Sequence, residues 1–239
     1  MSRLQIEKYK KQIKTLQNII EEFELLKNIR STARISDDKH KVLNFALVYM
    51  TSVFKKAKRS SIYLLRNPGN RLYLTAKGKN NYKNQKTWFP EFALGDGIAG
   101  IVAFTRQPLL CNDTKNDPRF VKYPDSKHRI KNILSVPIQI GDRVFGTLQV
   151  ANVCNSAGFN TKDQEKAVHI ADNIAEALSI LEAKELLNKD PIFEIYNYRY
   201  FQKTIKAKIN EKCALGLALL DLDNFKRFND KYGHLKGDS

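Results

Sequence analysis

Apolar residues recur at helical spacing in two long stretches of the chain. Within residues 4–30 the recurring positions are Ile6, Tyr9, Ile13, Leu16, Ile20 and Phe23. Within residues 163–187 they are Ala167, Ala171, Ile174, Leu178 and Leu181. Steps of three and four residues are the a/d pattern of a coiled coil, so both stretches are predicted to be helices. The first helix either lies on its own domain or pairs with a second copy, because so narrow an apolar stripe stabilises an isolated helix poorly.

The residues between these helices favour a sheet of antiparallel strands. Residues 61–66 and 71–75 are rich in β-forming residues and flank a Pro-Gly turn, which predicts a hairpin. Residues 133–138 and 144–153 flank a Gly-Asp turn and predict a second hairpin. A shorter strand is expected at 108–111. Helices at both ends and hairpins between them indicate an α+β fold.

Helix starts and loops complete the pattern. The Ser-Asp-Asp cluster at 36–38 is expected to cap a second helix, and Thr161 with Gln164 fits a capping box for the last one. Glycines open a short helix within residues 94–103. The polar residues 78–88 and the basic residues 112–131 are predicted to be loops.

Composition narrows the class of protein. The 239 residues are 42% hydrophobic, which is enough for a packed core. The longest apolar runs are far shorter than the roughly 20 residues that cross a bilayer, and the charged N-terminus does not resemble a signal peptide. Three widely spaced cysteines form neither a disulfide framework nor a zinc pattern. We therefore expect a cytoplasmic protein that does not enter a membrane.

The net charge of +16 is concentrated in one segment. Residues 39–90 hold twelve Lys and Arg and no Asp or Glu. Such a field attracts anions, nucleic acid included. No helix-turn-helix, RNA-binding or zinc-finger pattern accompanies it, so a solvated basic face is favoured over a nucleic-acid site.

A series of motifs between residues 31 and 188 resembles a GAF domain, a small-molecule sensory module. After a helix come R-S-S-I-Y-L-L, G-D-G-I-A-G-I-V-A, N-D-T-K-N-D-P-R-F, N-I-L-S-V-P-I, G-T-L-Q-V-A-N and F-N-T-K-D-Q-E. The resemblance implies an antiparallel sheet flanked by helices. It also implies that the pocket residues are Ser61, Gly97, Ile98, Ala99, Asp125, Ser126 and Gln149.

Cyclic AMP or cyclic GMP is the ligand class that this resemblance suggests. The glycine-rich start of the short helix presents backbone N–H groups suited to a cyclic phosphate, although the same glycines could serve only to pack helix on sheet. The stabilising motif of cyclic-nucleotide-binding GAF domains is only partly present, since Val153 stands where that subgroup has Lys.

The last part of the chain resembles the opening of a GGDEF domain, the diguanylate cyclase fold. Residues 221–238 read D-L-D-N-F-K-R-F-N-D-K-Y-G-H-L-K-G-D and follow an apolar run, 214–220, that is expected to be a strand. The resemblance implies that the Asp221 side chain and the Leu222 carbonyl would bind Mg²⁺. It also implies that Asn229 and Asp238 would recognise the guanine of GTP. The family joins two GTP molecules into cyclic di-GMP across a dimer of half-sites.

The GGDEF match is incomplete. In the entry motif Phe193, Glu194 and Tyr198 replace the usual Thr, Gly and Arg, and residues 1–239 do not contain the signature loop. We therefore expect an N-terminal dimerisation helix (1–30), a GAF domain (31–188) ending in a signalling helix (160–188), and an incomplete α/β GGDEF segment (189–239). The expected function is ligand-controlled cyclic di-GMP synthesis, with the 239-residue chain itself inactive. We expect a homodimer paired through the N-terminal and signalling helices. The alternative is a non-catalytic nucleotide receptor or scaffold.

Overall fold

The structure is a computed structural model and divides into two compact units, Met1–Leu181 and Glu182–Ser239. The residues that it describes are 3–54, 57, 59–66, 71–77, 91–121, 130–153, 157–193, 195–212, 214–233 and 236.

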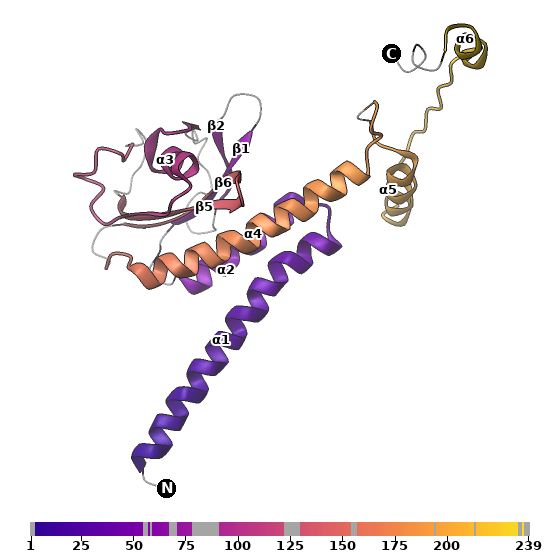
Figure 1. Cartoon of the computed structure of the whole chain (residues 1–239). Coiled ribbons are helices and arrows are strands. Elements are labelled where there is room, and N and C mark those ends of the chain that lie inside the picture. Colours follow the sequence, from indigo (N-terminus) through magenta and orange to yellow (C-terminus); the bar gives the residue numbers. More distant parts are fainter. Residues whose placement is uncertain are drawn as a thin grey trace. The chain divides into compact units, whose positions relative to one another are not determined.

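A six-stranded antiparallel sheet forms the centre of the first unit, in the order β3-β2-β1-β6-β5-β4 (Figure 1). The strands are β1 (Arg59–Arg66), β2 (Arg71–Lys77), β3 (Phe92–Ala93), β4 (Leu109–Cys111), β5 (Ile130–Ile140) and β6 (Arg143–Val153). The β1–β2 and β5–β6 pairs confirm both predicted hairpins. Pro137 of β5 lies two residues past Ser135, where the pairing with β4 ends, and pairs with Thr147 of β6.

Helices cover both faces of this sheet. On one face lie α2 (Lys39–Val53) and α4 (Thr161–Leu187), while α3 (Gly97–Thr105) packs on the other (Figure 1). The helix α1 (Arg3–Ile35) joins the core of the first face only near its C-terminal end, through Ile29 and Ala33. Strand residues alternate between the two faces, as the pleat requires. Ile62, Leu134 and Leu148 therefore join the core under α2 and α4, whereas Ile133 and Ala151 pack with α3.

The helix starts follow from their capping residues. Asp38 caps α2 by accepting hydrogen bonds from the His40 and Lys41 amides, as expected. At α4 the predicted capping box is wrong by one residue. The helix begins at Thr161, so Asn160 is the cap, and its amide oxygen accepts from the Asp163 N–H while the Asp163 carboxylate accepts from the Asn160 N–H.

The two predicted apolar stripes differ in burial. Every stripe residue of α4 named above is buried in the core of its own unit, so this stripe is not free for a partner helix. On α1, Ile29 and Ala33 are buried in the same core, whereas Ile6, Tyr9, Ile13 and Leu16 are 38–59% exposed. Four residues of the α1 seam are thus left uncovered in the described part of the chain.

The second unit contains α5 (Tyr198–Asn210) and α6 (Phe225–Tyr232). The predicted strand at 214–220 is not formed, and its residues are exposed, Leu219 and Leu220 at 93% each. A strand needs a neighbour to pair its backbone groups, and no strand lies beside this run among the described residues. At α6, Asn224 occupies the cap position, in a left-handed conformation and without a side-chain cap bond.

Candidate functional site

Two of the predicted pocket residues are direct neighbours across the sheet. Ser61 on β1 pairs with Gln149 on β6, which in turn pairs with Ser135 on β5. The Gln149 Nε2 donates a hydrogen bond of 3.3 Å to the Ser135 hydroxyl, and both side chains are buried. All three alternate with core residues of the α2 and α4 face, so they lie on the face that α3 covers. We call Ser61, Gln149 and Ser135 the polar row.

Three other predicted residues form the buried start of α3. Gly97, Ile98 and Ala99 are all inside the molecule. Gly97 has φ +62°, and a Cβ there would come within 2.9 Å of the Phe92 ring and 3.3 Å of Val121, so only glycine fits. The first helical hydrogen bond runs from the Gly100 N–H to the Asp96 carbonyl, which leaves the amides of Gly97, Ile98 and Ala99 as the donors that precede it.

Of the glycine-rich turn, the Gly95 N–H is used internally, because it donates to the Gly100 carbonyl at 2.9 Å. The turn therefore packs helix against strand, and the α3 amides remain a place for an anion. The predicted residues Asp125 and Ser126 lie outside the described residues.

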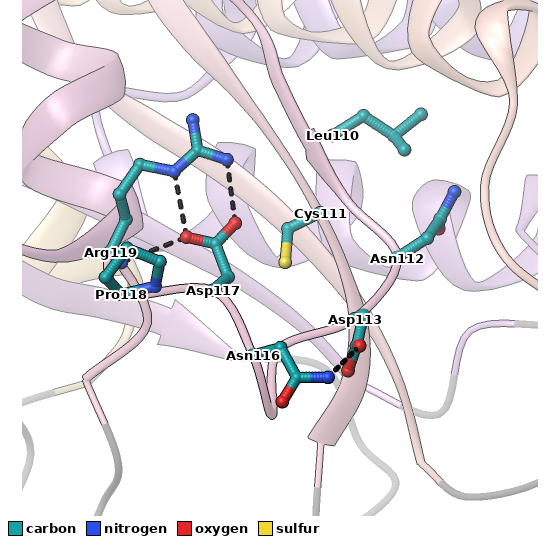
Figure 2. Close-up of a pocket in the computed structure, with 8 residues that line it drawn as sticks. All are labelled: Leu110, Cys111, Asn112, Asp113, Asn116, Asp117, Pro118 and Arg119. Atoms are coloured by element: carbon teal, nitrogen blue, oxygen red, sulfur yellow. Dashed lines mark hydrogen bonds and ion pairs between the residues drawn. The ribbon is translucent and has the colours of Figure 1, made fainter.

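An open hollow of about 510 Å³ lies in the loop after β4 (Figure 2). Its polar centre is Asp117, which accepts two hydrogen bonds from the Arg119 side chain, at 2.9 and 2.7 Å, and one from the Arg119 N–H at 2.9 Å. These bonds hold the pKa of Asp117 well below its usual range and raise that of Arg119. The ion pair shapes the loop rather than offering a free charge to a ligand.

The buried thiol of Cys111 faces the same hollow. Burial, followed by its hydrogen bond with Asp117, raises the pKa of Cys111 to about 11. A thiol with so high a pKa stays protonated near neutral pH and is a weak nucleophile. The hollow therefore lacks an activated nucleophile.

Asn112, on the rim of this hollow, is a residue that the sequence did not single out. Its side chain points away from the Asp117–Arg119 pair (Figure 2). The Nδ2 donates to the Phe159 carbonyl at 3.0 Å, and the Oδ1 accepts from the Phe159 N–H at 2.9 Å. Asn112 thus fixes the backbone just before α4 over a separation of 47 residues, which local sequence patterns do not reveal.

Three of the four predicted cyclase residues are among the described residues of the second unit. Asp221 and Leu222 lie in an exposed segment without regular structure, and the Leu222 carbonyl accepts from the Phe225 N–H at 3.4 Å. Asn229 is half-buried on α6, with its Oδ1 buried and without a partner. Asp238 lies outside the described residues.

The residues expected to bind Mg²⁺, Asp221 and Leu222, are adjacent in an exposed segment of the second unit. Among the described residues, no three His, Cys, Asp or Glu side chains are grouped closely enough to hold a metal ion. Asp221 and Leu222 supply one exposed carboxylate and one backbone carbonyl, and their role toward Mg²⁺ stays a prediction.

Two residues of the entry motif, Asp190 and Asn197, form hydrogen bonds between their side chains and the backbone. The Asp190 carboxylate accepts from the Ile192 and Phe193 amides, at 2.9 and 3.1 Å. The Asn197 amide group donates to the Leu187 carbonyl at 2.9 Å and accepts from the Tyr200 N–H at 3.0 Å. The retained Asp and Asn of the motif are thus structural in this chain.

No helix in the described part of the chain is both long and apolar enough to cross a bilayer.

Curated relatives match both parts of the chain. The dual 3′,5′-cyclic-AMP and -GMP phosphodiesterase 11A of Takifugu rubripes is 26% identical over 205 residues, covering 79% of this chain and 22% of the relative. The cone cGMP-specific 3′,5′-cyclic phosphodiesterase subunit alpha′ of Gallus gallus is 28% identical over 180 residues, covering 66% and 20%. Diguanylate cyclase VdcA of Vibrio cholerae is 33% identical over 99 residues, covering 38% and 29%. The chain thus spans less than a third of each of these relatives.

Solved structures agree on the fold. The GAF domain of a phosphoenolpyruvate-protein phosphotransferase from Coxiella burnetii matches with a TM-score of 0.59 at 18% identity, covering 71% of this chain and 99% of that one. The corresponding Acinetobacter domain matches with a TM-score of 0.55 at 19% identity, covering 69% and 96%. These likenesses confirm the predicted GAF fold.

Two family models match in succession along the chain. The model described as GAF domain covers residues 36–179, and the model described as diguanylate cyclase, GGDEF domain covers residues 187–239. The first covers more than half of the chain and agrees with the sheet and helices above. The chain therefore belongs to the GAF domain family, with a GGDEF domain match following its GAF domain.

Proposed function

We propose that the chain is a small-ligand-sensing GAF module that regulates a diguanylate cyclase, which makes cyclic di-GMP from two GTP. The observation that carries this proposal is the order of the two matches and the helix between them. α4 begins inside the GAF match and ends at the first residue of the GGDEF match. A change at the GAF pocket that moves α4 would reach the cyclase segment along a single helix.

A cyclic nucleotide is the ligand class that we propose for the GAF domain. The polar row offers an amide and two hydroxyls for a base or ribose. The first amides of α3 suit a phosphate, because the start of a helix favours negative charge. The two phosphodiesterases named above act on cyclic AMP or cyclic GMP, which places these nucleotides first among the candidates.

A thermal-shift screen of the 239-residue chain tests this ligand class. The probes are cyclic AMP, cyclic GMP, GMP and GTP, and a ligand that binds the folded state raises the melting temperature as its concentration increases. We expect a shift with one of the cyclic nucleotides. No shift with either of them would contradict the proposal and favour a GAF domain that serves only dimerisation.

Two matched glutamine variants locate the binding site. Gln149→Leu removes the amide from the polar row, and we expect it to abolish the shift. Gln139→Leu makes the same change in β5, in a part of the sheet away from the row, and is expected to retain it. An equal shift in both variants would exclude the polar row as the binding site.

We further propose that the chain forms a homodimer through the exposed seam of α1. In the heptad pattern Ile6 and Ile13 occupy a positions and Leu16 occupies a d position. This combination favours a parallel coiled coil of two helices. Because the α4 stripe is buried in its own unit, pairing of α4 would be confined to its last turn, where Leu186 and Leu187 are 75% and 68% exposed. Parallel pairing would bring two cyclase segments to the same end.

Sedimentation of charge variants tests this dimer. Ile13→Lys places a charge in the seam, and we expect a monomer. Ile35→Lys places the same charge at the end of α1, outside the seam and 86% exposed, and should remain dimeric. A wild-type chain that sediments as a monomer at micromolar concentration would rule out the seam as a dimer interface.

A non-catalytic nucleotide receptor is the second candidate function. It is favoured by the altered entry motif, in which Phe193 and Tyr198 are 54% and 70% exposed. Incubating the 239-residue chain with GTP and Mg²⁺ is expected to yield no cyclic di-GMP, because the chain does not contain the signature loop. GTP binding measured by calorimetry would support the receptor, and cyclic di-GMP formation would contradict the expected inactivity.

A further inference from the structure

Each end of α4 is attached to a neighbouring segment by the side chain of one asparagine. At the N-terminal end Asn112 bonds to the Phe159 backbone, two residues before α4 begins. At the C-terminal end Asn197 bonds to the carbonyl of Leu187, the last residue of α4. In both cases the amide uses its donor and its acceptor at once, which fixes the orientation of the two segments more tightly than a single bond.

The first attachment links the loop after β4 to the start of α4. Asn112 directly follows the strand residue Cys111 and lies on the rim of the hollow that Asp117 and Arg119 shape. The backbone fits closely around it, because a Cβ at Gly158 would come within 2.5 Å of the Asn112 Oδ1. Two residues after Gly158, Asn160 caps α4. A shift of the loop therefore acts on the first turn of α4 through a short and closely packed path.

The second attachment links the end of α4 to α5. The Asn197 Nδ2 donates to the Leu187 carbonyl at 2.9 Å and to the Lys189 carbonyl at 3.4 Å, and these groups lie at the end of α4, where carbonyls lack helical partners. Its Oδ1 accepts from the Tyr200 N–H and so caps α5. The Asn197 N–H donates to the Asn188 carbonyl at 2.9 Å. One residue thus terminates one helix and starts the next.

We propose that Asn112 and Asn197 are the positioning residues through which α4 takes up movement of the GAF loop and passes it to the cyclase segment. The inference rests on the proposed signalling role of α4. Asn112 and Asn197 are the two residues whose side chains hydrogen-bond the ends of α4 to the neighbouring segments. Neither residue contacts a reacting group.

A double-variant experiment on the 239-residue chain tests the first attachment. Asp117→Asn loosens the loop by weakening its bonds to Arg119, and amide hydrogen exchange is followed in residues 157–166. We expect Asp117→Asn to speed this exchange when Asn112 is present. In the Asn112→Ala background, where exchange is already fast, Asp117→Asn should add nothing. Asn116→Ala, in the same loop but bonded only to Asp113, should leave the response to Asp117→Asn intact.

Additive effects of Asp117→Asn and Asn112→Ala would overturn the role of Asn112. So would an unchanged exchange rate at 157–166 in the single variant Asp117→Asn. A residue that merely stabilised the unit would raise exchange throughout Met1–Leu181, whereas a positioning residue affects the start of α4 selectively.

Spin-label distances test the second attachment. Nitroxides at Ala183→Cys and Lys206→Cys report on the end of α4 and on α5, in a background with Cys154→Ser and Cys213→Ser; Cys111 is 4% exposed. The labelled chain is diluted with unlabelled chain so that only distances within one chain are seen. We expect one narrow distance distribution.

Asn197→Asp separates attachment from capping. Its carboxylate can still accept from the Tyr200 N–H, but it cannot donate to the Leu187 carbonyl and repels it. We expect the narrow distribution to be lost while the helix signal of α5 persists. Asn188→Ala, an amide removed from the same turn, should keep the distribution narrow. A narrow distribution in Asn197→Asp would overturn the proposal. Neither experiment contains a ligand or nucleotide, so these outcomes are independent of the thermal-shift and cyclase tests.

Discussion

The GAF unit and the cyclase segment both contain many apolar residues, but these residues are buried in the first and exposed in the second. In the GAF unit a continuous core fills the space between the sheet and three helices, with Ile62, Leu134 and Leu148 at most 1% exposed. In the cyclase segment neither α5 nor α6 has a buried residue, although both helices are strongly amphipathic. Apolar residues do not make a core by themselves. They need a second layer to pack against, and only the GAF unit supplies one.

A matched pair of leucine truncations measures this difference and is the largest effect that we expect. Leu148→Ala, at 1% exposure, should lower the free energy of unfolding by about 2–5 kcal/mol through lost burial and a residual cavity. Leu219→Ala, at 93% exposure, should change it by less than about 0.5 kcal/mol. Urea unfolding followed by circular dichroism gives both values. Equal losses would show that the cyclase segment is packed in solution.

Two glycines, one in each region, differ in the same way in how closely other atoms surround them. A Cβ at Gly100 would come within 2.1 Å of the Ala93 carbonyl oxygen, whereas a Cβ at Gly216 would meet nothing within 4 Å. We expect Gly100→Ala to cost about 1–3 kcal/mol, since α3 must move away from β3. Gly216→Ala should be close to neutral in the same unfolding experiment. A stable Gly100→Ala chain would mean that α3 is not held against β3.

The Asp117–Arg119 pair makes the stability of the GAF unit depend on pH in the acidic range. The pKa of Asp117 is held low by its bonds to Arg119, so its contribution is present above the usual Asp pKa and is lost as pH falls toward the lowered value. Melting temperatures from pH 7 down to pH 3 should therefore fall less steeply for Asp117→Asn than for wild type. Asp223→Asn, an exposed carboxylate of the second unit, serves as the control and should follow the wild-type curve.

Cys111 supplies a test at alkaline pH. Because burial raises the pKa of the thiol to about 11, well above that of an unfolded cysteine, alkylation by iodoacetamide at pH 8.5 should be slower than for an unfolded cysteine by a factor on the order of 10 to 100. The associated stability is complete below the unfolded pKa and is lost as pH rises through the folded one. Mass spectrometry of the labelled peptide follows the reaction. Rapid labelling in the folded chain would show that the loop after β4 opens freely.

The smallest effect is expected at the ion pair between α1 and α4. Arg30 and Glu176 lie 2.9 Å apart, but their side chains are 37% and 50% exposed, and exposed pairs contribute only about 0–1 kcal/mol. Glu176→Gln should therefore change the free energy of unfolding much less than Leu148→Ala does. A larger loss would indicate that α1 is held on its unit mainly by charge instead of by Ile29 and Ala33.

Several elements could be predicted from the sequence because their causes are local. The alternation of apolar residues and the turn residues between them are enough for the two hairpins, and Asp38 is enough for the start of α2. The cap of α4 was misplaced by one residue because Asn160 and Thr161 are both good capping residues, and the sequence does not say which one leaves the helix first. The motifs also led to Ser61 and Gln149, which the sheet does place side by side.

What the sequence could not supply depends on distant contacts. Ser135 joins the polar row only because β5 and β6 pair in one particular register. Asn112 reaches Phe159 across 47 residues. The stripe of α4 looked free for a partner, yet the core of its own unit covers it.

The sequence by itself determined the order of helices and hairpins, the GAF character of the first part and the GGDEF character of the last, because these are written in periodicity and in motifs of contiguous residues. Only the tertiary structure decided which apolar stripe is used internally and which stays exposed, and whether residues 214–220 become a strand. The physical reason is the same in each case. Burial and strand pairing are properties of two surfaces, and a local pattern describes only one of them.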